Sequence, residues 1–118
     1  MKENNIIQQK SYAFALKIIV IYQHLTREQK EFILSKQLIR SGTSVGANVE
    51  EAIGAQSKND FTAKMSIAYK EARETLYWIR LLTDGKFLQD PQSVTLLKDC
   101  DELLRILGSI IASSKIRK

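Results

Sequence analysis

The chain is poor in the residues that interrupt secondary structure. Among its 118 residues it has one proline, Pro91, and five glycines. Runs rich in valine, threonine and aromatic residues with strict alternation are also missing. So few breaking residues favour long helices over the many turns that an all-β chain needs. The sequence therefore predicts an all-α protein.

Cysteine and long apolar runs are equally scarce. Cys100 is the only cysteine, so an intramolecular disulfide is excluded and a reducing compartment is expected. The longest unbroken apolar run, residues 18–22, is far shorter than the ~20 residues that span a bilayer. No apolar signal core follows Met1. We therefore expect a cytoplasmic protein without a membrane partner.

Positive charge exceeds negative charge. Eighteen Lys and Arg residues face thirteen Asp and Glu residues, which gives a formal net charge of +5. The 44% of hydrophobic and 26% of charged residues are ordinary proportions for a folded chain, and the length fits one domain over residues 1–118. A basic surface attracts polyanions over long range, so RNA and DNA are candidate partners.

Four helical segments are predicted, at about residues 5–25, 27–56, 59–83 and 91–114. In the first, Ile7, Phe14 and Ile18 keep the spacing of a helix face. Thr26 is a candidate cap for the second helix, and Asp90 followed by proline announces the fourth. Because the connections are short, consecutive helices should pack antiparallel, as an up-down-up-down four-helix bundle.

Residues 40–52, RSGTSVGANVEEA, look at first like a phosphate-binding loop, since they combine two glycines with hydroxyl side chains. A Walker-type loop, however, needs Lys followed by Ser or Thr after its last glycine, and Ala47 follows Gly46. The apolar stripe through Leu38, Gly42 and Val45 also keeps its helical phase. We interpret the segment as helix. Close approach of a neighbouring helix would offset the cost of each glycine, about 1 kcal/mol.

A polar stripe follows the same predicted helix on another side. It consists of Arg40, Ser44, Asn48 and Glu51, and small residues flank it. Interleaved small and polar residues suit a tight helix–helix contact with a hydrogen-bonded network. The stripe predicts a buried or intermolecular network in which Arg40 meets Glu71 or Glu74, within one chain or between chains. A solvated face and a ligand site remain alternatives.

The third and fourth predicted helices have more apolar surface than one bundle needs. Ile67, Trp78 and Leu81 lie opposite the core stripe of the third helix. In the fourth, apolar residues between Val94 and Ile111 cover about half the circumference. An exposed apolar patch marks a contact with a partner. We therefore predict a homo-oligomer of closed symmetry that shelters Trp78.

Residue types that carry catalysis are sparse. His24 is the only histidine, and it lies near the end of the first predicted helix, where a partly charged imidazole is favoured. Neither zinc-like ligand spacing nor the Glu-x-x-His pairs of di-iron bundles occur. Cys100 falls on the core stripe of the fourth helix. We expect no enzyme activity, no metal and no cofactor.

Two segments, RSGTSVGANVEEA and KNDFTAKMSIAYKEARETLYWIRLL, resemble the four-helix-bundle family named after the 23S ribosomal RNA intervening sequences. The matching positions are Arg40-Ser41, Ser44-Val45, Asn48-Val49, Glu51-Ala52, Phe61, Ile67-Ala68, Glu74 and Trp78. One departure is Ala52-Ile53-Gly54, where many members have glycine directly after the acidic residue. The resemblance implies an antiparallel bundle that assembles as a ring-shaped homopentamer. It also implies kinship with accessory variability determinants of diversity-generating retroelements, which bind nucleic acid and a reverse transcriptase.

Two functions follow from these patterns. The first is a non-catalytic oligomeric module that binds RNA or DNA through phosphate contacts with little sequence specificity, in a role linked to ribosomal RNA intervening sequences. The alternative is a protein–protein scaffold or adaptor for a reverse transcriptase or another nucleic-acid enzyme. The candidate nucleic-acid contacts are Lys10, Lys17, Lys64, Lys70, Arg73 and Arg80.

Overall fold

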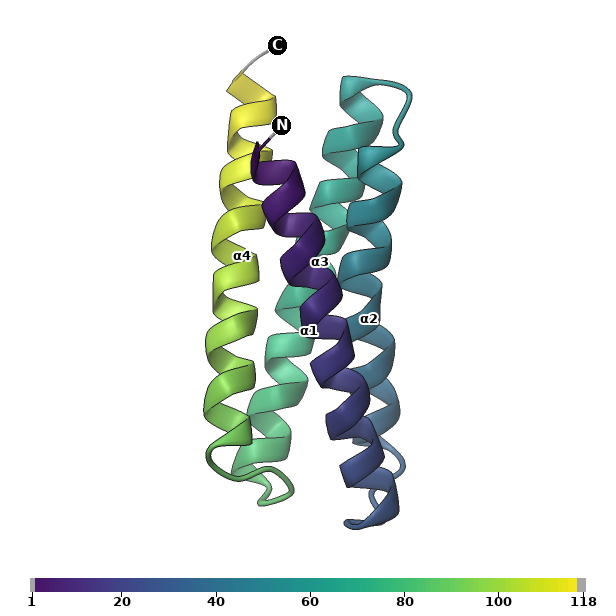
Figure 1. Ribbon diagram of the computed structural model, residues 1–118, viewed down its shortest axis with the longest axis vertical. Coiled ribbons are helices and arrows are strands. Elements are labelled where there is room, and N and C mark those ends of the chain that lie inside the picture. The colour runs from purple at the N-terminus through teal and green to yellow at the C-terminus, as the bar shows by residue number, and fades with distance from the viewer. Residues whose placement is uncertain (1, 117–118) are drawn as a thin grey trace.

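A computed structural model describes residues 2–116, with side chains from Ile6 to Lys115, and shows four helices that run up and down along one long axis (Figure 1). They are α1 (Lys2–Arg27), α2 (Leu34–Ile53), α3 (Lys58–Asp84) and α4 (Gln92–Ile116). Each helix packs against the next, and α4 returns to α1. The prediction of an all-α up-down bundle is confirmed. Over the described residues, none of these helices is long and apolar enough to cross a membrane.

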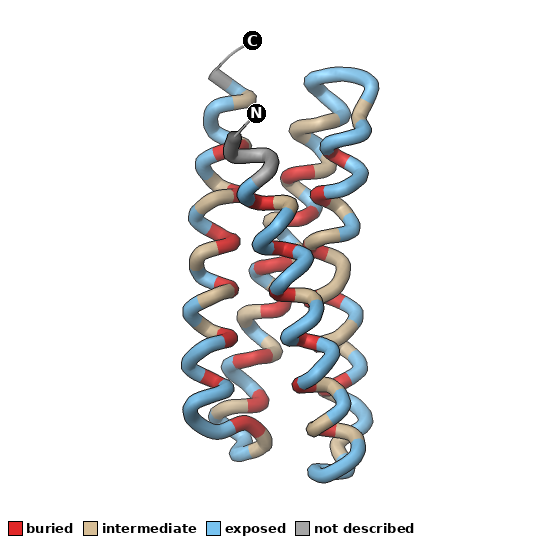
Figure 2. The backbone as a smooth tube through the Cα atoms, in the orientation of Figure 1, coloured by how far each residue is buried: buried red, intermediate tan, exposed pale blue. Residues whose placement is uncertain are grey.

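The core fills the space between the inward faces of all four helices (Figure 2). The stripe predicted for α1 is fully buried at Ile7 and Ile18 and nearly so at Phe14. Burying side chains of this size contributes about 1.5–3 kcal/mol each. The amphipathic pattern of the chain therefore accounts for the packing of the bundle.

The glycine-containing segment of α2 is helical, as predicted, and its glycines lie against α1. A Cβ at Gly42 would come within 2.9 Å of Ile18 Cγ1, and one at Gly46 within 3.4 Å of the Ser11 carbonyl oxygen. The contact at Gly42 is shorter than atoms tolerate without moving. Absence of a side chain at Gly42 is therefore what allows Ile18 to reach the core at this level.

The connection between α1 and α2 differs from the prediction. Thr26 does not cap α2: it belongs to α1, and its hydroxyl donates to the Tyr22 carbonyl oxygen at 2.9 Å. A turn follows, in which Lys30 has a φ of 56°, and α2 begins only at Leu34. Residues 28–33 thus form a connection between α1 and α2, although the segment contains neither glycine nor proline.

Glu31 caps α2 in place of Thr26. Its carboxylate accepts hydrogen bonds from the backbone N–H groups of Ile33 at 3.1 Å, Leu34 at 2.9 Å and Ser35 at 2.7 Å. Burial by itself raises the pKa of Glu31, but these bonds together outweigh it and lower the pKa below its ordinary value. A helix N-terminus stabilises the charged carboxylate in this way.

The other helix ends lie close to the predicted positions. At the start of α3, the Ser57 side chain accepts from the Asp60 N–H at 3.0 Å. α4 begins one residue after Pro91 and continues to Ile116, and the Asp90 carboxylate accepts from the Ser93 hydroxyl at 3.0 Å. Short polar side chains thus mark these two helix starts, as general capping preferences indicate.

Candidate nucleic-acid interface

Arg40 joins α2 to α3 within one chain. Its guanidinium lies 3.3 Å from the Glu71 carboxylate and also pairs with Glu74. Glu74 in turn accepts a hydrogen bond of 2.9 Å from the indole N–H of Trp78. The prediction that Arg40 meets these glutamates is confirmed, and the structure places the contact inside the protomer.

The rest of the predicted polar stripe does not join this cluster. The Asn48 side-chain amide donates to the Ser44 carbonyl oxygen at 2.9 Å, one turn back along α2. Glu51 pairs with Lys64 of α3 at 3.0 Å, and this hydrogen bond and its negative charge raise the pKa of Lys64. The stripe is therefore a set of local contacts along the α2–α3 boundary rather than one continuous network.

Trp78 is less exposed than its position in the sequence indicated. It is half-buried and packs against the core, and its ring meets the edge of the Tyr77 ring with centroids 5.0 Å apart. Of these two rings, that of Tyr77 is the exposed one, with 52% of the residue's surface accessible. On either side of Trp78 along α3, Ile67 and Leu81 remain exposed. The apolar patch predicted on this helix exists, but its exposed aromatic residue is Tyr77 instead of Trp78.

The wide apolar stripe of α4 is used inside the bundle. Leu96, Cys100 and Leu107 are buried, and Leu97 and Ile106 pack partly against the core. Val94 is the exception, since it is exposed. The expectation that α4 adds surplus apolar surface for an oligomer was wrong, because α4 faces both α1 and α3 and needs a wide stripe to pack against both.

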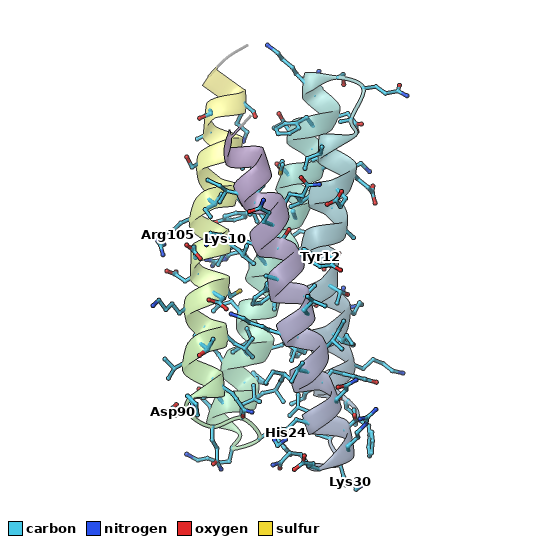
Figure 3. All side chains as sticks on the ribbon, in the orientation of Figure 1. Lys10, Tyr12, His24, Lys30, Asp90 and Arg105 are labelled. Carbon is cyan, nitrogen blue, oxygen red and sulfur yellow. The ribbon has the colours of Figure 1, made fainter. Side chains whose placement is uncertain are left out.

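Three of the six candidate nucleic-acid contacts are engaged in ion pairs. Lys10 lies 3.2 Å from Glu102 and Lys17 lies 2.5 Å from Asp99, so both join α1 to α4. Figure 3 labels Lys10 on the side of α1 that faces α4. The third, Lys64, is held by Glu51 as described above. These charges are partly neutralised by their carboxylate partners.

The other three candidate contacts form a group on α3. Among the side chains described, from Ile6 to Lys115, no carboxylate lies within ion-pair distance of Lys70, Arg73 or Arg80, and all three are exposed. With Tyr77 they occupy one outward stripe at spacings of three, four and three residues. We call these four residues the basic stripe. Sequence reasoning identified its cations but missed Tyr77, whose signal was its position one turn from an arginine on each side.

Groups that carry catalysis or bind metal are not assembled in the described part of the chain. Over residues 6–115, whose side chains the structure describes, no three His, Cys, Asp or Glu side chains are placed to share a metal ion. The Cys100 thiol donates to the Ala72 carbonyl oxygen at 3.3 Å, and burial, together with the charges of Asp101 and Asp99, raises its pKa to about 12. The thiol is therefore neutral at ordinary pH and packs as part of the core.

Four helices in simple succession, with a glycine-bearing second helix and an Arg–Glu cluster joining it to the third, define a small up-down bundle protein. The family of 23S rRNA-intervening sequence proteins matches residues 3–109 of the chain. The fold is also similar to the crystal structure of a protein with unknown function from the S23 ribosomal protein family of Bacteroides thetaiotaomicron VPI-5482. That similarity has 45% identity and a TM-score of 0.91, over 93% of this chain and 98% of the other. No curated protein matches the chain. The chain belongs to the 23S rRNA-intervening sequence protein family, as the sequence resemblance indicated.

Proposed function

We propose that this chain is a non-catalytic module that binds RNA or DNA through the basic stripe, with little sequence specificity and in a role linked to ribosomal RNA intervening sequences. The observation that carries the proposal is the grouping on one exposed stripe of α3 of three cations, Lys70, Arg73 and Arg80, that have no carboxylate partner within the described residues. Cations without such partners can pair with phosphate and release the counterions that condense on nucleic acid.

Tyr77 adds a second kind of contact to the same stripe. Its ring is exposed and lies between Arg73 and Arg80, one turn away in each direction. A nucleobase can stack on such a ring whatever its identity, and the neighbouring cations can hold the backbone. Stacking of this kind requires unpaired bases, so single-stranded or looped RNA is the favoured substrate class.

We also propose that the protein works as a homo-oligomer, for which the family resemblance implies a ring of five. One basic stripe offers three cations, which is a modest charge for binding nucleic acid. A closed assembly repeats the stripe in every subunit and multiplies the positive field. This repetition is the physical reason for joining the binding and assembly proposals.

The test is RNA binding as a function of salt. The variant Lys70→Gln/Arg73→Gln/Arg80→Gln is compared with Lys36→Gln/Lys58→Gln/Lys98→Gln, which removes the same charge from exposed positions elsewhere. Because each lost phosphate contact lowers the slope of log K against log salt by about 0.7–0.9, the stripe variant should lose about 2 in slope and the control much less. Equal losses would contradict the assignment to this stripe. Undetectable binding by the wild-type chain at low salt would refute the function itself.

A further inference from the structure

The outward side of α1 is an exposed surface without charged residues. Tyr12 and Val20 have 67% and 61% of their surface accessible, and Leu16 and Ile19 are also exposed. No charged residue lies among them. We call this surface the α1 face; its members are Gln9, Tyr12, Ala13, Leu16, Ile19, Val20 and Gln23. In a basic protein, an apolar helix face without charge marks a contact surface.

A hollow extends the α1 face onto α2. Its volume is about 230 Å³, and small side chains line much of it, including Ala15, Gly46 and Ala47. Tyr12 forms part of its rim and is labelled in Figure 3. A hollow with small residues at its base can receive a large side chain from a partner, as interface pockets do.

A second surface, on the α2 side of α3, matches the α1 face in length. It consists of Ile67, Glu71, Glu74, Trp78 and Leu81, and we call it the α3 seam. Gln9 to Gln23 and Ile67 to Leu81 both span fourteen residue steps, which is about 21 Å at 1.5 Å per residue. The α3 seam is apolar at Ile67, Trp78 and Leu81 and lies on a different side of the bundle from the α1 face, so a single protomer can use both surfaces at once.

The polar groups of the two surfaces are complementary. The α3 seam carries two carboxylates, which Arg40 partly neutralises. The α1 face itself carries no charge, and its Tyr12 hydroxyl and glutamine amides are hydrogen-bond donors. The one carboxylate that lines the adjoining hollow, Glu50, already accepts from the Gln8 side-chain amide at 2.9 Å. Complementary donors and acceptors around an apolar centre are typical of a specific interface.

The two surfaces also lie at the same height in the bundle. Ile18 of α1 lies against Gly42 of α2, and the neighbouring Ser41 hydroxyl accepts from Thr75 of α3 at 2.9 Å. The midpoints of the α1 face and the α3 seam, Leu16 and Glu74, are therefore almost level. Since α1 and α3 run in the same direction (Figure 1), a rotation about an axis parallel to the bundle carries one surface onto the other without a shift along the axis.

We infer that the α1 face of one copy docks on the α3 seam of a second copy. This head-to-tail contact rests on the homo-oligomer proposed above and identifies the surfaces that build it. A contact between unlike surfaces repeats from copy to copy and closes into a ring when the rotation fits. Pairing α1 faces with each other would leave every α3 seam uncovered. The centre of the basic stripe lies about 100° from that of the α3 seam around α3, toward α4, so Arg73 and Arg80 stay accessible in this arrangement. Tyr77 borders the contact, because its ring meets Trp78.

The inference is tested with one blocking variant for each surface. Leu16→Glu places a charge in the α1 face, and Ile67→Glu places one in the α3 seam. Val94→Glu is the matched control, because it changes an exposed apolar residue of α4 outside both surfaces. Light scattering at micromolar concentration should find the wild type and the control assembled and each blocking variant monomeric. An equimolar mixture of the two blocking variants should form dimers, since each supplies the surface that the other lacks.

The outcomes separate this inference from the oligomer proposal. A mixture that stays monomeric overturns the head-to-tail contact, and so does an Ile67→Glu variant that assembles like the wild type. If the wild type is itself monomeric, the proposed oligomer fails together with the inference. Circular dichroism checks that each variant keeps its helices. Val20→Lys and Leu81→Lys repeat the experiment with a second residue from each surface, so that misfolding of one variant does not decide the result.

Discussion

The contact between Gly42 and Ile18 predicts that adding a single methyl group in α2 will destabilise the bundle. Alanine is favoured over glycine in a helix interior by about 1 kcal/mol. At Gly42, however, the new Cβ would lie 2.9 Å from Cγ1 and 3.0 Å from Cγ2 of Ile18. Both atoms are attached to a β-branched carbon with little rotational freedom in a helix. The clash therefore cannot be relieved by moving the end of a flexible side chain.

The net effect follows from the two opposing terms. Overpacking a core costs about 1–3 kcal/mol, and the gain in helix propensity offsets about 1 kcal/mol of it. Gly42→Ala should therefore lower the free energy of unfolding by about 1 kcal/mol, which for a domain of this size lowers Tm by about 4 °C. Gly108→Ala is the control, because a Cβ there meets Tyr69 at an ordinary 3.7 Å. This control should be more stable than the wild type.

The assay is urea unfolding followed by circular dichroism, at one protein concentration. Repeating it in an Ile18→Ala background isolates the contact, since truncation removes both clashing atoms and leaves space for the new methyl. In this background the effect of Gly42→Ala on the free energy of unfolding should change sign, so that the substitution stabilises the chain. A Gly42→Ala variant that is as stable as Gly108→Ala in the wild-type background would refute the reasoning, because it would show that α1 moves away from α2 at little cost.

Three further predictions follow from single contacts. Glu31→Gln should destabilise the chain by about 1 kcal/mol at neutral pH, because it weakens the cap of α2. The pKa of Glu31 is lower in the folded chain than in the unfolded chain. The stability that the wild type gains over Glu31→Gln is therefore complete at pH values above the unfolded-state pKa of about 4.3, and it is lost as the pH falls through the folded-state pKa. Urea titrations of both proteins over this pH range measure the difference. Cys100 should resist a thiol reagent at pH 8 in the native protein and react fully in denaturant; rapid native labelling would contradict its burial. Arg40→Met should cost about 1 kcal/mol in thermal unfolding, a modest value because the guanidinium is half exposed, and no loss would show that its two ion pairs contribute nothing.

The architecture was predictable because the pattern that determines it is local. Periodic apolar residues identified each inward face, and the unbroken phase through Gly42 distinguished a helix from a phosphate-binding loop. The pairing of Arg40 was predicted only as far as its partners, Glu71 or Glu74, and the structure shows that both are used within one chain. Spacing along a helix identifies which residues share a face, and the packing of two helices decides which of them meet.

The connection before α2 could not be located by the same reasoning. Residues 28–33 include Phe32 and Ile33, which extend the helical pattern, and no residue in the segment breaks a helix by itself. The turn is stabilised instead by the Glu31 carboxylate, which accepts from three backbone N–H groups. Glutamate is not a usual cap, so its position gave no signal that composition or periodicity would detect.

The surface of the bundle was the hardest part to predict. Whether a lysine is paired depends on the register between helices that are distant in the sequence, as with Lys10 and Glu102. Periodicity cannot supply that register. The α1 face is present in the sequence as a second apolar stripe through Tyr12, Leu16 and Val20, and periodicity does not tell whether such a second stripe is buried or exposed.

The boundary between α1 and α4 is the side of the bundle that depends most on ion pairs. α1 packs less extensively against α4 than the other adjacent helices pack against each other, and Lys10–Glu102 and Lys17–Asp99 bridge this boundary at the surface. Salt screens such pairs while it leaves apolar packing intact or strengthens it. Rising ionic strength should therefore loosen this boundary first, where Phe14 lies beside Lys10, Lys17 and Leu103. Ion pairs also join α2 to α3, through Arg40 and Lys64, but the packing there is more extensive. One side of the bundle should thus respond to the composition of the solution before the others do.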